Sequence, residues 1–112
     1  MYDFCRTMHK DGGKVAFGEV KRKVIECLNN GHVLHEERND IDVKNLLSTG
    51  VVSIIEITTI IGRARGNSYS STPHHYDAEI DVHVIKTISS GQNWYIKWYF
   101  IEPDCVFISV HE

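Results

Sequence analysis

The sequence predicts an α+β domain in which two N-terminal helices pack on a four-stranded, mainly antiparallel sheet. Helical apolar spacing is confined to the first 50 residues, whereas the rest of the chain is rich in β-branched and aromatic residues. At 112 residues the chain is long enough for one hydrophobic core and too short for two. We therefore expect a flexible N-terminal arm over residues 1–17 and a single α+β domain over residues 18–112.

Apolar spacing and end signals predict the two helices. The first, from residue 17 or 18 to residue 28, carries apolar residues at helical spacing: Val20, Val24, Ile25 and Leu28. The Asn29-Asn30-Gly31 sequence then supplies a stop. A second, short helix is expected to begin at the N-cap candidate Asp42 and to end before Gly50.

From residue 51 the pattern favours strands. The run over residues 51–61, VVSIIEITTII, is β-branched and apolar on both faces, which predicts a central strand. Residues 62–77 are polar and turn-rich and are interpreted as one long loop. A strand follows over residues 78–88, with Val82 and Val84 inward and His83 outward, and Ser89-Ser90-Gly91 is the next turn.

Residues 93–112 predict a closing hairpin around a Glu-Pro-Asp turn. Successive side chains of a strand point to opposite faces, so one face receives Trp94, Ile96, Trp98 and Phe100. The other face receives Tyr95, Lys97 and Tyr99. If Val106, Ile108 and Val110 join the tryptophans, Ser109 lies near Lys97 and His111 lies near Tyr95.

The charge balance limits the kind of anion that the protein binds. The net charge is -3, and residues 51–112 hold only 4 basic side chains against 7 acidic ones. Tight nonspecific binding to duplex nucleic acid requires many neutralised phosphates, so it is disfavoured. Any anion-binding surface must be local.

Other sequence signals indicate an intracellular protein without a common cofactor motif. Three cysteines without CxxC spacing suggest neither a disulfide framework nor a cysteine zinc site. No apolar run is long enough to cross a bilayer, and no secretory signal is evident, so a cytoplasmic location and no membrane partner are expected. P-loop, Rossmann and HExxH motifs do not occur.

The last three strands, placed side by side, are predicted to share a polar face bearing His83, Tyr95, Lys97, Tyr99, Ser109 and His111. RNA cleavage by the neighbouring 2′-hydroxyl needs a base, an acid and positive charge, which these side chains supply. Lys97 with Arg63 or Arg65 would hold the phosphate, and Tyr95 or Tyr99 would stack on a base. The competing interpretation is an ordinary solvated sheet face, which commonly carries the same residue types.

A metal site is the weaker chemical alternative. His74 and His75 precede Asp77, Asp81 and His83, but the spacing matches no recognised zinc pattern, and a polar loop is favoured. Cys27 and Cys105 are interpreted as small packing residues. The sequence therefore predicts no metal and no cofactor.

Several short motifs carry a family resemblance. They are Tyr95-Ile96-Lys97, the terminal VFISVH strand over residues 106–111, Asp81-Val82, Ser68-Tyr69-Ser70, and His35-x-x-Arg38 followed by Ile41-Asp42-Val43. Together they cover roughly residues 18–112 and resemble the RelE-like superfamily of small bacterial toxin ribonucleases, particularly its MqsR-type branch.

The resemblance implies a metal-independent endoribonuclease that acts on free or ribosome-bound mRNA and is restrained by an antitoxin protein. Tyr95 matches the family's catalytic tyrosine, with Lys97 as its companion. The family's lysine before the third strand falls at Ser70, and its glutamine falls at Ile80. His83, His111 and the Arg63/Arg65 loop are the hypothetical replacements; the alternative is a non-catalytic toxin-like interaction module.

Overall fold

The computed structural model describes residues 13–36, 45–74 and 76–112. Its helices are α1 (Gly13–Asn30), α2 (Ile54–Arg63) and the short 3-10 helix η2 (Gly66–Ser68). Its strands are β1 (Val33–His35), β2 (Tyr69–Pro73), β3 (Asp81–Ser89), β4 (Gln92–Ile101) and β5 (Asp104–His111). Among the described residues, no helix has the length and apolar character needed to span a membrane.

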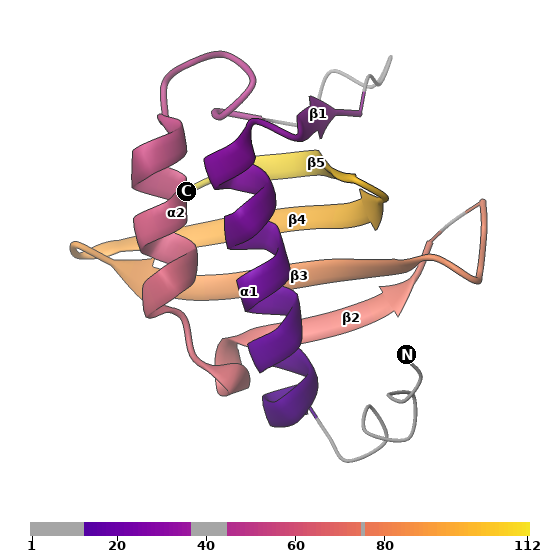
Figure 1. The fold of residues 1–112 in the computed structure, drawn as a ribbon. Helices are drawn as coiled ribbons and strands as arrows, with labels where there is room; N and C mark the ends of the chain where they lie inside the picture. The colour runs from indigo at the N-terminus through magenta and orange to yellow at the C-terminus, as the bar shows by residue number, and fades with distance from the viewer. Residues whose placement is uncertain (1–12, 37–44, 75) are drawn as a thin grey trace.

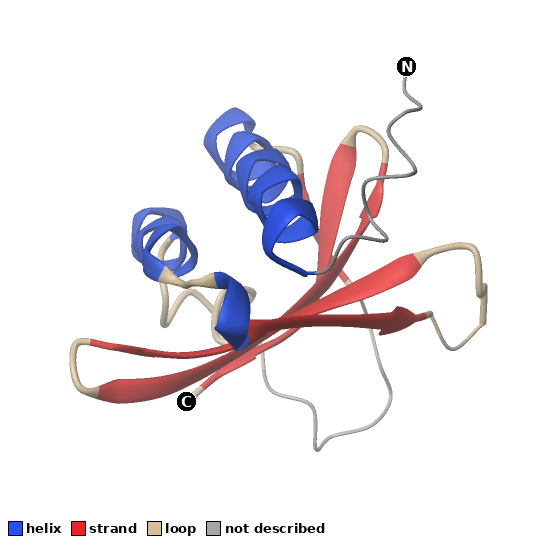
Figure 2. Cartoon of the chain, turned by 90° about the horizontal axis from the view of Figure 1, so that it is seen from below, coloured by secondary structure: helices blue, strands red, loops and turns tan. Residues whose placement is uncertain are grey.

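Helices α1 and α2 lie side by side on one face of a twisted sheet (Figures 1 and 2). The strand order is β1-β5-β4-β3-β2, with β1 parallel to β5 and the other neighbours antiparallel. The predicted α+β class and the antiparallel arrangement of the last three strands are confirmed. The sheet is five-stranded and mixed, so the expected four-stranded sheet is corrected.

Helix α1 is longer than its apolar spacing predicted. It begins at Gly13, so residues 13–17 belong to the helix and not to the expected arm; residues 1–12 lie outside the described part. Phe17, Val24 and Leu28 are buried against the sheet, and Gly31 follows the helix with φ of 77°. This left-handed conformation suits glycine and ends the helix as the sequence indicated.

The predicted central strand over residues 51–61 is wrong, because this segment forms α2. Ser53 accepts a hydrogen bond from the Glu56 backbone N–H, while the Glu56 side chain accepts one from the Ser53 N–H. This capping box fixes the helix start. The apolar stripe of Ile57, Ile60 and Ile61 then packs on the core, which compensates for the low helix propensity of β-branched residues.

Two further sequence predictions are corrected next to α2. The helix expected from Asp42 to before Gly50 falls partly outside the described residues; its described part is a bridge at Asn45, opposite Val110, followed by a turn. The loop expected over residues 62–77 contains η2 and the edge strand β2. Propensity did not indicate β2 because its sequence, YSSTP, is polar, and it is stabilised by pairing with β3.

The hairpins around β4 explain how the sheet sorts its side chains. Ser90 and Gly91 both have positive φ (54° and 80°), as expected of a tight turn between twisted strands. Between β4 and β5 the register shifts, because Lys97 opposes Ser109 while Trp98 opposes Phe107. Ile108 is therefore an extra residue, a β-bulge that reverses the parity of β5.

Candidate functional site

The open face, meaning the sheet face opposite α1 and α2, carries three rows of side chains across β3, β4 and β5. The rows are Lys86–Tyr95–His111, Val84–Lys97–Ser109 and Val82–Tyr99–Val106. The first two rows confirm the predicted proximity of His111 to Tyr95 and of Ser109 to Lys97. Val106 lies with Tyr99 and not with the tryptophans, because the bulge at Ile108 lies between Val106 and Val110.

Tyr95 and His111 form a stacked pair on this face. Their ring centroids are 5.1 Å apart with an interplanar angle of 27°. The Lys86 ammonium lies 5.8 Å from the Tyr95 ring centroid on the other neighbouring strand. His111 Nδ1 is 3.1 Å from the Glu112 carbonyl oxygen, so a proton on Nδ1 would be donated there and Nε2 would remain as the basic nitrogen. A phenol, an imidazole and a cation thus meet on a solvent-accessible surface.

Lys97 lies in the adjacent row, two residues along β4 from Tyr95. The same row continues through Val84 to Ser70 on β2, because Ser70 opposes Val84. Ser70 is exposed. The position that the RelE-like resemblance aligns with a lysine is therefore on the open face but carries a neutral hydroxyl. Ile80, aligned with the family's glutamine, precedes β3 and lies outside the strand.

Tyr99 shares the open face but contacts Glu36, which the sequence did not single out for chemistry, and His74, which was considered only for a metal site. Its hydroxyl donates a 3.4 Å hydrogen bond to Glu36, and its ring meets the His74 ring edge-on at 4.8 Å. His74 Nε2 lies 3.9 Å from Glu36 Oε2. Glu36 follows β1 and His74 follows β2, so only the tertiary fold brings them together; no local sequence signal links them.

His83 is not on this face, which corrects its predicted place beside Tyr95. It opposes Trp98 on β4 and Ser71 on β2, and therefore faces the helices. Residues 82–85 are all buried, so alternation of apolar and polar residues did not reveal which side of β3 faces the helices. His83 is only 7% exposed.

The surroundings of His83 are aromatic and supply one hydrogen-bond partner. Its Nδ1 lies 2.8 Å from the Tyr69 hydroxyl, and its ring centroid is 5.5 Å from Trp98 and 5.3 Å from Phe100. Burial, with a smaller contribution from the Lys23 charge, lowers the pKa of His83 to about 4. Burial also raises the pKa of the Tyr69 phenol. The pair is thus neutral and hydrogen-bonded at neutral pH.

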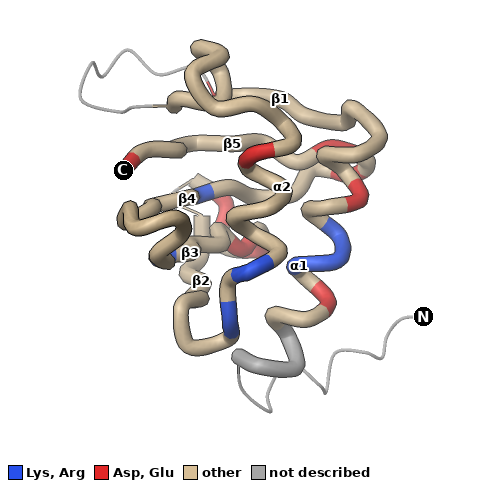
Figure 3. Tube along the Cα trace, turned by 90° about the vertical axis from the view of Figure 1, so that its left-hand side faces the viewer, with Lys and Arg blue, Asp and Glu red and all other residues tan. Residues whose placement is uncertain are grey.

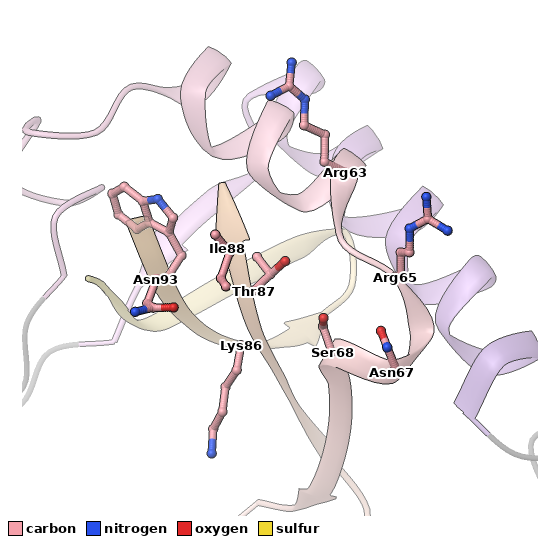
Figure 4. A pocket seen from close by; sticks show the side chains of 9 residues that line it. Arg63, Arg65, Asn67, Ser68, Lys86, Thr87, Ile88 and Asn93 are labelled. Atoms are coloured by element: carbon pink, nitrogen blue, oxygen red, sulfur yellow. The ribbon is translucent and has the colours of Figure 1, made fainter. Parts of the chain in front are cut away.

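Arg63 and Arg65 line a separate cavity of about 480 Å³ beside the β3–β4 hairpin. The other lining residues are Asn67, Ser68, Lys86, Thr87, Ile88, Asn93 and Trp94. Figure 4 shows the two arginines projecting from the end of α2 and the segment after it, with Lys86 on the opposite side of β3. Three of the four basic residues after residue 51 line this cavity, and the fourth is Lys97.

The acidic residues of the same half of the chain gather elsewhere. Five of them belong to the β2–β3 connection, the start of β3 and the β4–β5 turn: Asp77, Glu79, Asp81, Glu102 and Asp104. Arg63 ends α2 and Arg65 follows it. Figure 3 shows blue segments at the lower end of α2 as well as on α1. The sheet therefore has a basic end at the β3–β4 hairpin, which is the kind of local anion-binding surface that the net charge required.

The histidines considered for metal binding do not come together, and the cysteines considered for thiol chemistry are buried. His74 contacts Tyr99 on the open face, whereas His83 faces the helices, so these two histidines do not converge. In the described ranges, no group of three His, Cys, Asp or Glu side chains is placed to hold a metal ion. Cys27 and Cys105 are buried, and burial raises the pKa of both thiols, which confirms them as packing residues.

Comparison with known proteins identifies no relative: no family model matches this chain, and no curated protein matches it. The RelE-like resemblance stays a prediction.

Proposed function

We propose that this protein is a toxin-like endoribonuclease that cleaves mRNA by metal-independent acid-base chemistry on the open face of its sheet. The observation that supports the proposal best is the stacked Tyr95–His111 pair with Lys86 beside the tyrosine ring. Lys97 lies in the next row. This arrangement offers a proton acceptor, a proton donor and positive charge within a few residues of one another.

In the proposed reaction, the 2′-hydroxyl of a nucleotide attacks its own 3′-phosphate. His111 takes the hydroxyl proton, the new 2′-O–P bond forms, and the P–O5′ bond breaks. Tyr95 gives a proton to the leaving 5′-oxygen, and Lys97 with Lys86 stabilises the negative charge that develops on the phosphorane. The products are a 2′,3′-cyclic phosphate and a 5′-hydroxyl.

The neighbouring basic and aromatic residues would position the RNA. Arg63 and Arg65 are exposed at the basic end of the sheet and would contact phosphates that flank the cleaved bond. Tyr99, one row beyond Lys97, is the candidate contact for a base. His83 has no role in this scheme, because it lies on the helix-covered face.

The cellular setting in this proposal is the cytoplasm, where the substrate is free or ribosome-bound mRNA. An antitoxin protein would restrain the activity. The mRNA substrate and the antitoxin protein are parts of this functional proposal, and the fold can be explained without either.

The decisive experiment incubates the purified protein with end-labelled mRNA, with and without ribosomes, and with and without EDTA. We expect cleavage that survives EDTA and leaves 2′,3′-cyclic phosphate ends. Lys97→Ala should reduce cleavage, whereas Arg22→Ala, on the exposed side of α1, should not. Absence of cleavage in every condition, or cleavage that EDTA abolishes, would contradict the proposal.

The exposed Ser70 favours a second candidate, a non-catalytic toxin-like interaction module. Its hydroxyl occupies the open-face position that the resemblance aligns with a lysine, so the face lacks one cation. Under this alternative the wild-type protein cleaves no RNA, and Tyr95→Ala or Lys97→Ala weakens binding to a partner protein. Restoring the cation with Ser70→Lys should then still produce no cleavage.

A further inference from the structure

The outer edge of β3 is unpaired over its last four residues. The ladder between β2 and β3 ends where Tyr69 opposes Ile85, but β3 continues to Ser89. In the part of the chain that the structure describes, no other strand pairs with this edge. Four residues of β strand extend about 13 Å and present backbone N–H and C=O groups to any chain that reaches them.

The cavity lined by Arg63 and Arg65 runs along this edge. Three successive strand residues line it, namely Lys86, Thr87 and Ile88. Thr87 points to the helix-covered face and Lys86 and Ile88 point to the open face, so the cavity reaches both faces of β3. Asn67 and Ser68 place part of the cavity beside the outer edge, and Asn93 and Trp94 on β4 continue it toward the hairpin turn. Its volume of about 480 Å³ provides room for a short extended segment.

The cationic side chains that line the cavity favour a negatively charged ligand. Arg63, Arg65 and Lys86 are exposed, and none of them forms a salt bridge within the described residues. Of the described residues that line the cavity, none carries a carboxylate. Ile88 is 69% exposed beside the cations, so the surface also accepts an apolar side chain.

We propose that this edge is a docking site for an extended acidic polypeptide, which adds as a strand to β3 at residues 86–89 and places its carboxylates against Arg63, Arg65 and Lys86. Main-chain hydrogen bonds would give the register, and the three cations would give the selectivity for acidic sequences. The proposal does not depend on ribonuclease activity, although Arg63, Arg65 and Lys86 have a role in both.

A polypeptide fits this site better than RNA does. A strand edge alternates donors and acceptors, which a peptide backbone matches and a phosphate backbone, having only acceptors, does not. Among the described residues, the aromatic side chain that lines the cavity is Trp94, which is only 9% exposed, so little of its ring is open for a base to stack on.

The test measures binding of a fluorescent eight-residue peptide to the full chain by anisotropy. In this peptide pairs of glutamates alternate with pairs of valines, so that carboxylates lie on both faces of the added strand. A lysine–valine peptide of the same length and an eight-nucleotide single-stranded RNA serve as comparisons. The acidic peptide should bind at least about tenfold more tightly than the lysine peptide, and its binding should weaken as salt increases.

Backbone methylation of the peptide separates strand addition from simple charge attraction. In a strand pair, alternate N–H groups point toward the partner. N-methylation of every second residue in one phase should abolish binding, and methylation in the other phase should leave it nearly intact. Equal effects of the two phases would overturn the proposal.

Charge-reversal variants locate the site. Arg63→Glu with Arg65→Glu should lower peptide affinity at least about tenfold, and Arg65→Glu alone, outside α2, repeats the test if the double variant does not fold. Arg22→Glu is the matched control on α1 and should leave affinity unchanged. No binding of the acidic peptide, binding that Arg65→Glu does not weaken, or preferential binding of the RNA would overturn the proposal.

Discussion

Two tyrosine–histidine pairs lie on opposite faces of the same sheet, and they differ in almost every property that matters for chemistry. Tyr69 and His83 share a 2.8 Å hydrogen bond among aromatic rings on the helix-covered face. Tyr95 and His111 stack on the open face, partly exposed to solvent. The residue types are identical, so the environment alone assigns a structural role to the first pair and makes the second available for proton transfer.

The two pairs differ in the environment in which the histidine would be protonated. His83 must lose its solvent shell to be buried, and protonating it there is unfavourable, which is why its pKa falls to about 4. His111 has no such enclosure. A histidine that stays neutral throughout the physiological range cannot alternate as base and acid, so the buried pair is unsuited to catalysis at neutral pH.

The largest expected effect tests the open-face pair. His111→Ala and Tyr95→Phe should each lower RNA cleavage by about 10²-fold or more, because each removes a proton-transfer group. Thermal unfolding should change little, since both side chains are partly exposed. A cleavage assay and a melting curve on the same preparations check both statements. If His83→Phe proves equally inactive while remaining folded, the assignment of the pairs is wrong.

The next effect concerns stability at the buried pair. His83→Ala should destabilise the fold by about 3 kcal/mol, because it removes a buried ring and leaves the Tyr69 hydroxyl without its partner. Urea denaturation at pH 7.5 measures the change. His111→Ala is the matched control and should cost less than about 0.5 kcal/mol. Equal losses for the two variants would remove the distinction between the faces.

A third effect is the pH dependence of stability. Because the pKa of His83 is about 4 in the folded state and about 6.5 when unfolded, the unfolded chain binds more protons between these values. Stability from this residue is therefore complete above about pH 6.5 and falls as the pH drops toward 4, by about 2 kcal/mol between pH 7 and pH 5.

Comparison with His83→Phe isolates this contribution, since other groups also titrate. Between about pH 4 and pH 6.5, the slope of the unfolding free energy against pH should be smaller in the variant by the contribution of about one proton. An unchanged slope in His83→Phe would show that His83 does not titrate as its burial implies.

The smallest effect compares the two hydroxyls. Tyr69→Phe removes the hydrogen bond to His83 and should cost about 1 kcal/mol, whereas Tyr95→Phe should be close to neutral for stability. Denaturant midpoints of the two variants give the comparison directly. A larger loss for Tyr95→Phe would mean that the open-face pair, and not the buried one, supports the fold.

The sequence allowed the open-face pair to be predicted because strand alternation and a closing turn determine which residues oppose one another. It did not allow the place of His83 to be predicted, because β3 is buried on both faces over residues 82–85 and its pattern permits either orientation. For the segment that forms α2, the β-branched composition predicted a strand. The Ser53/Glu56 capping box was the better signal, because it indicates the start of a helix. The Glu36–His74 contact depends on tertiary structure and has no local signature.

The bulge at Ile108 lets β5 present two fully buried residues and two polar residues to the correct faces. Phe107 and Val110 both face the helices although they are three residues apart, because Ile108 is the extra residue between Phe107 and Ser109. Deleting Ile108 would remove the bulge, and Ser109 would then follow Phe107 directly and still oppose Lys97, as His111 would still oppose Tyr95. The strand therefore tolerates the loss of this one residue without changing which side chains meet Tyr95 and Lys97.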